Sequence, residues 1–225
     1  NMLPMVSLVN KTLIKHTFHP HSNMKLCIAV ALSSIALSQA WAPVSNRPFR
    51  QATSLNAASI WYSTSTGNTE TIAGYIAEAS GLSANDIGDA TADEISGADA
   101  LIVGAPTWHT GADEQRSGTS WDDWLYDTLP NLDLEGKKVA VFGCGDQESY
   151  SDYYCDAAGE LYDKFVEKGC KVYGFTSTEG YSHADSQAMR DGKFIGLMCD
   201  EDNQYDMSEG RAKAWVDQLK SEGFF

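Results

Sequence analysis

The chain has 225 residues, of which 43% are hydrophobic, and this is enough apolar material for a buried core, so the composition excludes a disordered chain. Its 31 acidic and 16 basic residues give a formal net charge of −15, which argues against nucleic acid as a partner because phosphates require a basic face. The charge is unevenly distributed: residues 1–58 contain five basic residues and no acid, so residues 59–225 carry a net charge of −20. The chain is therefore expected to consist of two parts joined end to end.

Residues 1–57 are predicted to be targeting sequence. Residues 1–23 show no sustained periodicity, and we interpret them as translated sequence upstream of a start at Met24 or as disordered. Residues 24–40 have the order of a signal peptide, with one Lys, a mostly apolar run and a small residue at the end. The apolar run is shorter than the roughly 20 residues that span a membrane, so we expect no stable membrane insertion. The alternative is an N-terminal helix packed on the domain.

A second targeting signal is predicted in residues 41–57, which contain Ser and Arg but no acid, as is typical of transit peptides. Residues 40–43 read Ala-Trp-Ala-Pro. This junction resembles the bipartite presequence of algae with complex plastids, in which a signal peptide precedes an Ala-aromatic-Ala-Pro junction and a transit segment. The resemblance implies delivery to the plastid (chloroplast) stroma and leaves residues 58–225 as the folded domain.

Residues 58–225 alternate apolar runs with amphipathic stretches. Continuous apolar runs that end in Gly are typical of parallel strands covered on both faces, so the pattern predicts an α/β domain with a parallel sheet. The predicted strands are Ala58–Tyr62, Ala100–Gly104 and Lys138–Gly143, and the predicted helices are the pattern from Ile72 to Ala79, Trp121–Thr128, Ala157–Lys168 and Ser208–Glu222.

The segment between Lys171 and the last helix is too long for an ordinary connection. An apolar run at residues 171–175 is followed by a polar stretch, and a second apolar run lies at residues 194–198. We interpret these runs as one last strand that is split by an insertion of about 20 residues.

The cysteines of the predicted domain do not form a metal or disulfide pattern. They contain no CxxC pair, and no His lies at metal-ligand spacing from them. We expect free thiols in a reducing compartment and no metal site; the alternative is a secreted disulfide protein. These cysteines are Cys144, Cys155, Cys170 and Cys199.

A loop rich in hydroxyl groups connects the first strand to the first helix. Backbone N–H groups at a helix N-terminus bind phosphate together with Ser and Thr hydroxyls. The loop contains no Lys or Arg, which argues against an NTPase P-loop because that motif needs a Lys. We therefore predict a site for a phosphomonoester; the alternative is a helix N-cap without a ligand. The loop residues are Ser63, Thr64, Ser65, Thr66, Gly67, Asn68 and Thr69.

Two further loops follow the next two strands and are expected at the same edge of the sheet. Trp108 in one loop and Tyr150 in the other can stack on a flat aromatic ring, whereas each alone would more often be a packed core residue. A phosphate loop beside an aromatic clamp, without a catalytic base, indicates a site for flavin mononucleotide (FMN). The candidate residues are Pro106, Thr107, Trp108, His109, Thr110, Gly111, Cys144, Gly145, Asp146 and Tyr150.

These motifs resemble those of the flavodoxins, specifically the long-chain class. They are the segments 64–69, 106–108 and 143–147 followed by Tyr150, while the split last strand with the acidic run 200–204 is similar to the long-chain insertion. The resemblance implies a doubly wound five-stranded parallel sheet of order 2-1-3-4-5 that binds FMN.

The resemblance also assigns roles within the site. It implies that residues 63–69 hold the flavin phosphate, that Trp108 and Tyr150 flank the isoalloxazine, and that Asp146 meets its pyrimidine edge. The peptides of residues 109–111 would lie near flavin N5, where the family's backbone rearranges on one-electron reduction and stabilises the neutral semiquinone. Two departures are the segment 111–121, which is longer than in the better-known members, and a Ser where a Gly is common before the stacking Tyr.

The predicted function is a low-potential one-electron carrier rather than an enzyme. The resemblance implies a monomer that replaces ferredoxin between photosystem I and ferredoxin–NADP reductase. A charge of −20 disfavours a second electron on the flavin and steers the protein onto basic docking sites. The alternatives are a flavin-dependent NAD(P)H quinone reductase and a phosphate-sensing module. The latter is disfavoured because Tyr62 and Ser63, not an acid, end the first strand.

Overall fold

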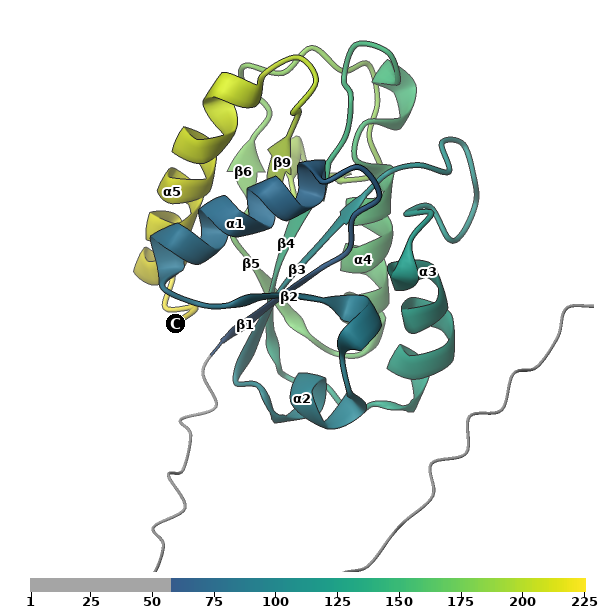
Figure 1. Ribbon diagram of the computed structural model, residues 1–225, viewed down its shortest axis with the longest axis vertical. Coiled ribbons are helices and arrows are strands. Elements are labelled where there is room, and N and C mark those ends of the chain that lie inside the picture. The colour runs from purple at the N-terminus through teal and green to yellow at the C-terminus, as the bar shows by residue number, and fades with distance from the viewer. Residues whose placement is uncertain (1–57) are drawn as a thin grey trace, which may run out of the picture. The chain divides into compact units, whose positions relative to one another are not determined.

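The computed structural model describes residues 58–225 (Figure 1). The signal peptide and the transit segment predicted within residues 1–57 lie outside the described residues. In the described part of the chain, no helix is both long and apolar enough to cross a membrane.

A parallel sheet forms the centre of the domain. Its strands are β1 (Ser59–Tyr62), β2 (Ala84–Asp86), β3 (Ala100–Pro106), β4 (Lys138–Cys144), β5 (Lys171–Tyr173) and β9 (Gly196–Cys199). The order β2-β1-β3-β4-β5 confirms the predicted order. β5 pairs with the first half of β4 and β9 with the second half, in consecutive register, so the last strand is split as the sequence predicts.

Helices cover both faces of the sheet (Figure 1). They are α1 (Asn68–Ser80), α2 (Ala92–Gly97), α3 (Ser120–Asp123), α4 (Asp156–Glu167) and α5 (Tyr205–Ser221). α1 and α5 cover one face, where Ile60 and Ile102 are buried, and α3 and α4 cover the other, where Trp61 and Val103 are buried. Strand residues thus alternate between two apolar cores, as expected for a sheet buried on both faces.

Close packing between β3 and β4 requires a glycine. A Cβ atom at Gly104 would lie 2.2 Å from the ring of Phe142, so any larger residue would displace this ring from the core. The Gly104 carbonyl in turn accepts a hydrogen bond from the Trp121 indole N–H at 2.8 Å, which fixes α3 on the sheet.

Several short elements are not evident from the sequence. The strand β2 contains Asn85 and Asp86 and lacks an apolar run, and α2 is a six-residue helix that starts with a capping box between Thr91 and Glu94. The predicted helix 121–128 is α3 followed by a turn of π-helix, η2 (Trp124–Thr128). The 3₁₀ turns are η1 (Ile87–Asp89), η3 (Leu129–Asn131) and η4 (Ser151–Tyr153).

The insertion between β5 and β9 forms a small antiparallel sheet of order β6-β8-β7. Its strands are β6 (Thr176–Ser177), β7 (Met189–Arg190) and β8 (Lys193–Phe194). Tyr181 and Phe194 pack edge to face in it, with ring centroids 4.9 Å apart. The acidic run 200–204 follows β9, the second half of the split strand, and lies at the carboxyl edge of the main sheet.

Candidate functional site: a pocket at the carboxyl edge of the sheet

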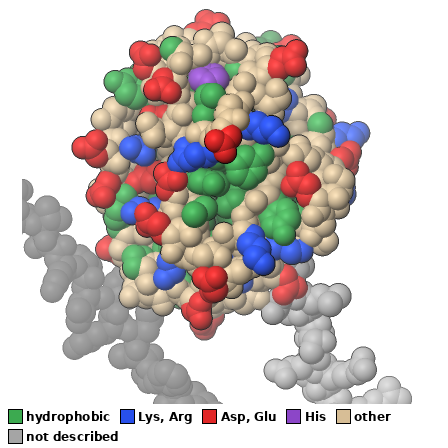
Figure 2. Space-filling model, turned by 180° about the vertical axis from the view of Figure 1, so that it is seen from behind, with side chains coloured by type: hydrophobic (Ala, Val, Ile, Leu, Met, Phe, Trp, Pro, Cys, Tyr) green, Lys and Arg blue, Asp and Glu red, His purple; other side chains and the backbone are tan. Residues whose placement is uncertain are grey.

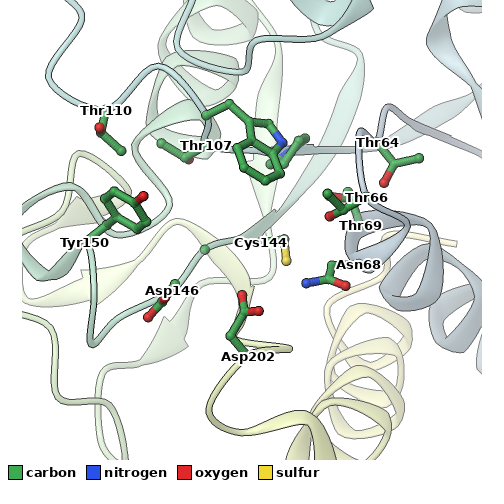
Figure 3. A pocket seen from close by; sticks show the side chains of 13 residues that line it. Thr64, Thr66, Asn68, Thr69, Thr107, Thr110, Cys144, Asp146, Tyr150 and Asp202 are labelled. Atoms are coloured by element: carbon green, nitrogen blue, oxygen red, sulfur yellow. The ribbon is translucent and has the colours of Figure 1, made fainter.

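A pocket of about 380 Å³ lies where the loops after β1, β3, β4 and β9 meet (Figure 3). Three of these loops are those predicted from the sequence, and the fourth contributes Asp202. Five of the candidate residues, Ser63, Ser65, Gly67, His109 and Gly111, do not line the pocket. The lining residues are Thr64, Thr66, Asn68, Thr69, Pro106, Thr107, Trp108, Thr110, Cys144, Gly145, Asp146, Tyr150 and Asp202.

The first turn of α1 forms one end of the pocket. Gly67 precedes the helix with a φ of 96°, and its N–H donates to Thr64 Oγ1 at 2.9 Å. Within residues 58–225 no side chain caps this helix, and the buried Thr69 Oγ1 has no hydrogen-bond partner. Open N–H groups at a helix N-terminus and an unpartnered buried hydroxyl together form a donor set for an anion.

Two residues of the same loop, Ser63 and Ser65, do not line the pocket. Ser63 is 1% exposed, and its hydroxyl hydrogen-bonds to the Thr119 hydroxyl, so it holds the start of α3 near β1. Ser65 is exposed to solvent and lies outside the pocket lining. The hydroxyl-rich loop is therefore shared between the pocket and the surrounding framework.

Trp108 and Tyr150 are the large aromatic side chains of the pocket lining. Trp108 is 49% exposed and Tyr150 is 52% exposed, whereas core aromatic residues such as Trp121, Phe142 and Phe165 are fully buried. Two half-exposed aromatic rings at one pocket provide apolar faces for a flat ring system. Thr107, next to Trp108, accepts a hydrogen bond from the Ala157 N–H at 3.0 Å and so connects this loop to the start of α4.

His109 bonds within its own loop. Its Nδ1 lies 2.7 Å from the Gln115 carbonyl oxygen, which makes Nδ1–H the donor, and 3.7 Å from Asp122 Oδ2. The backbone N–H groups of Trp108 and His109 both donate to the Arg116 carbonyl, at 3.2 and 3.1 Å. The segment 111–119 thus supports the backbone at Trp108.

Asp146 shapes the loop that carries Tyr150. Its Oδ1 accepts hydrogen bonds from the N–H groups of Glu148 (3.0 Å) and Ser149 (2.8 Å) and from the Asn203 side-chain amide (2.8 Å). Partial burial raises the pKa of Asp146, but the hydrogen bonds from Ser149, Asn203 and Glu148 outweigh it, and the pKa is lowered overall. This carboxylate is therefore ionised at neutral pH.

The fully buried Asp200 joins the loops after β4 and β9. Its carboxylate accepts hydrogen bonds from the N–H groups of Gln147 (3.1 Å), Asp202 (3.1 Å) and Asn203 (2.9 Å). Burial, followed by the charges of Asp146 and Asp200, raises the pKa of Asp202. Neither Asp200 nor Asp202 is among the residues predicted for the site, although their position directly after a strand of the sheet was a usable signal.

The floor of the pocket includes a neutral thiol. Cys144 is 4% exposed, and burial, with a smaller contribution from Cys199, raises the pKa of its thiol far above the ordinary range. In residues 58–225 all four cysteines are buried and free, as expected from their spacing.

Residues 60–215 match the model of the family described as flavodoxin. The chain belongs to the flavodoxin family. It is 44% identical over 168 residues to a flavodoxin of Nostoc sp. (strain PCC 7120), covering 72% of this chain and 95% of that one. It is 38% identical over 167 residues to flavodoxin 1 of Salmonella typhimurium, covering 72% and 92%. Its structure is similar to that of a Fusobacterium nucleatum flavodoxin bound to FMN, with a TM-score of 0.65, 31% identity, and coverage of 74% and 98%.

The pocket of this flavodoxin fits an FMN. The donors of α1 suit a phosphate without a counter-charge, since neither Lys nor Arg lines the pocket. Trp108 and Tyr150 supply apolar surfaces for the ring, and the buried Cys144 adds an uncharged floor.

Proposed function

We propose that this flavodoxin binds one FMN non-covalently and carries single electrons between other proteins. The observation that carries the proposal is the unpartnered Thr69 hydroxyl at an uncapped helix N-terminus, in the same pocket as two half-exposed aromatic rings. Thr69 and the α1 N–H groups would bind the phosphate, and Trp108 and Tyr150 would bind the ring. When bound, FMN supplies redox chemistry in one-electron steps, and the chain holds and orients it.

The charges around the pocket support a strongly reducing carrier. The loops 63–69, 105–111, 144–150 and 200–206 contain six acidic residues and no Lys or Arg. A negative field at this edge disfavours a second electron in the pocket, because like charges raise each other's energy most where water is excluded. The potential for the second electron is therefore expected to be low.

The acidic pocket edge also suits basic partners, and we propose photosystem I and ferredoxin–NADP reductase, with the protein acting as a monomer in place of ferredoxin. Figure 2 shows the back of the domain, where Lys and Arg side chains are interspersed with Asp and Glu around exposed apolar side chains. The pocket loops lack basic residues, so they present a more uniformly negative surface to a partner.

Stepwise photoreduction of the FMN-loaded protein, followed by visible absorption, tests this function. We expect a yellow protein that develops long-wavelength absorbance half-way through reduction and loses it again on full reduction. A protein that remains colourless with added FMN would refute the cofactor, and direct passage to the fully reduced spectrum would refute the single-electron role. Turnover of NAD(P)H and a quinone by the purified protein alone would favour a quinone reductase instead.

We also propose that residues 1–57 direct the protein to a plastid stroma. The support is the charge contrast between the two parts of the chain and the Ala-Trp-Ala-Pro junction at residues 40–43. A fluorescent protein fused behind residues 24–57 should enter the stroma of an alga with a complex plastid. Replacement of Trp41 by Ala should stop the fusion before the stroma, and unchanged import would refute the role of this junction.

A further inference from the structure

Glu160 is a buried carboxylate in the middle of α4. It is 4% exposed, and its neighbours Ala157 and Leu161 are part of the apolar core. Among residues 58–225, no Lys, Arg or His lies within ion-pair distance of it. A buried carboxylate without a counter-charge is unfavourable unless hydrogen bonds satisfy it, so the groups that donate to it define what it does.

The donors to Glu160 come mainly from the long segment after β3. Oε1 accepts from the Gln115 N–H and Oε2 from the Arg116 N–H, both at 2.8 Å, and the Tyr126 hydroxyl donates to Oε1 at 2.5 Å. Gln115 has a φ of 56°, which is rare outside glycine, and this conformation turns two successive N–H groups to the same side. Strain of this kind persists only where the surroundings hold it, and the Glu160 carboxylate is what the two N–H groups meet.

The same two residues also hold the pocket loop, through their carbonyl groups. The Arg116 carbonyl accepts the N–H groups of Trp108 and His109, and the Gln115 carbonyl accepts Nδ1–H of His109. Trp108 lines the pocket directly. Residues 115 and 116 therefore link the Glu160 carboxylate to the loop that carries the aromatic ring: their N–H groups donate to Glu160, and their carbonyl groups accept from residues 108 and 109.

We propose that Glu160 is a positioning residue that fixes the segment 108–110 against the flavin ring and so sets the affinity for FMN and the potential of its first electron. This inference rests on the proposed function. Without the carboxylate the segment samples more conformations, and ordering it on binding weakens the affinity. The midpoint potential of a bound flavin depends on the difference between the protein's affinities for the flavin's two oxidation states. A segment that contacts the ring therefore shifts this potential when the segment becomes free to change conformation.

Three variants separate positioning from charge and packing. Glu160→Gln keeps the volume but can accept only one of the two N–H groups, because its amide nitrogen is a donor. Glu167→Gln is the matched control, since it removes the same charge from the same helix at an exposed position. Tyr126→Phe removes the third donor and leaves both backbone hydrogen bonds in place.

Three measurements decide the proposal: FMN affinity, the two midpoint potentials, and amide hydrogen exchange at Trp108 and His109 in the apoprotein. In Glu160→Gln we expect the Kd to rise roughly tenfold, the equivalent of one lost hydrogen bond, and the two amides to exchange at least several-fold faster. The first midpoint potential should differ from that of Glu167→Gln, while Tyr126→Phe should match the wild type. Equal affinity, potential and exchange in the two Gln variants would overturn the proposal.

The outcomes distinguish this proposal from the function on which it rests. If the wild-type protein bound no FMN, the proposed function would fail, whereas the exchange of the two amides would still decide whether Glu160 holds the segment. If Glu160→Gln did not fold, Glu160→Asp would replace it, since the shorter side chain keeps the charge but reaches only one N–H group. Amide exchange and FMN affinity equal to those of the wild type in Glu160→Asp would then refute the positioning role of Glu160.

Discussion

Replacing Thr69 by Val should move the stability of the apoprotein and the affinity for FMN in opposite directions. Val has the shape of Thr without the hydroxyl, and Thr69 is 1% exposed with an unpartnered Oγ1. In the apoprotein the substitution removes a buried polar atom, so the free energy of unfolding should rise by about 1 kcal/mol. With FMN present it removes a hydrogen bond to a charged phosphate, worth roughly 1.5–3 kcal/mol, so the Kd should increase roughly 10- to 100-fold.

Urea unfolding of the apoprotein and titration of FMN by fluorescence quenching measure the two effects. Thr71→Val is the matched control, because the Thr71 hydroxyl is exposed and already donates to the Gly67 carbonyl at 3.1 Å. This control should lose a little stability and keep its affinity. A Thr69→Val protein that is less stable without FMN and binds it as tightly as the wild type would refute the assignment of the phosphate to α1.

Three further changes test other parts of the structure. Asp200→Ala leaves the buried N–H of Gln147 and its neighbours without an acceptor, so we expect a loss of about 2–4 kcal/mol in denaturant unfolding and weaker FMN binding; an unchanged midpoint would contradict this. Gly104→Ala places a Cβ 2.2 Å from the Phe142 ring and should lower the stability by about 2 kcal/mol or more, whereas a neutral effect would mean that the strands can separate. The hydrogen-bonded Asp146 has a lowered pKa, so it stabilises the fold above its unfolded pKa of about 4, and this contribution disappears as the pH falls through its folded value. The Asp146→Asn variant should therefore lose less stability than the wild type between about pH 4.5 and pH 2, as measured by acid titrations followed by circular dichroism. Parallel curves of stability against pH would show that this carboxylate does not contribute to the acid sensitivity of the fold.

The parts of the fold that could be predicted from sequence are those set by local patterns. Continuous apolar runs identify β1, β3 and β4 because each is buried on both faces. The split last strand follows from two separated apolar runs that together have the length of one strand. In contrast, β2 has only three residues, two of them with polar side chains, and it is held in the sheet by its pairing with β1, which no local pattern indicates.

The candidate site shows the same division. The hydroxyl-rich loop and the aromatic residues are evident because their chemistry is unusual for a strand end. Glu160 has no such signal, since its partners Gln115 and Arg116 lie about 45 residues away and are reached only through the tertiary fold. The helix pattern around it predicts a core position, and nothing local indicates that a loop would supply the hydrogen bonds.

The buried thiols bear on how such a carrier resists oxidation of its cysteines. Reduced flavins that meet oxygen release peroxide, and peroxide attacks cysteines as thiolates. Cys144 forms part of the pocket and Cys199 lies beside it on the next strand, yet burial raises the pKa of Cys144 far above neutrality and that of Cys199 to about 12. Both thiols are therefore protonated near pH 7 and shielded from solvent. A protein of this design should retain its activity through many cycles in air, where one with an exposed thiolate at the same position would be damaged by its own by-product.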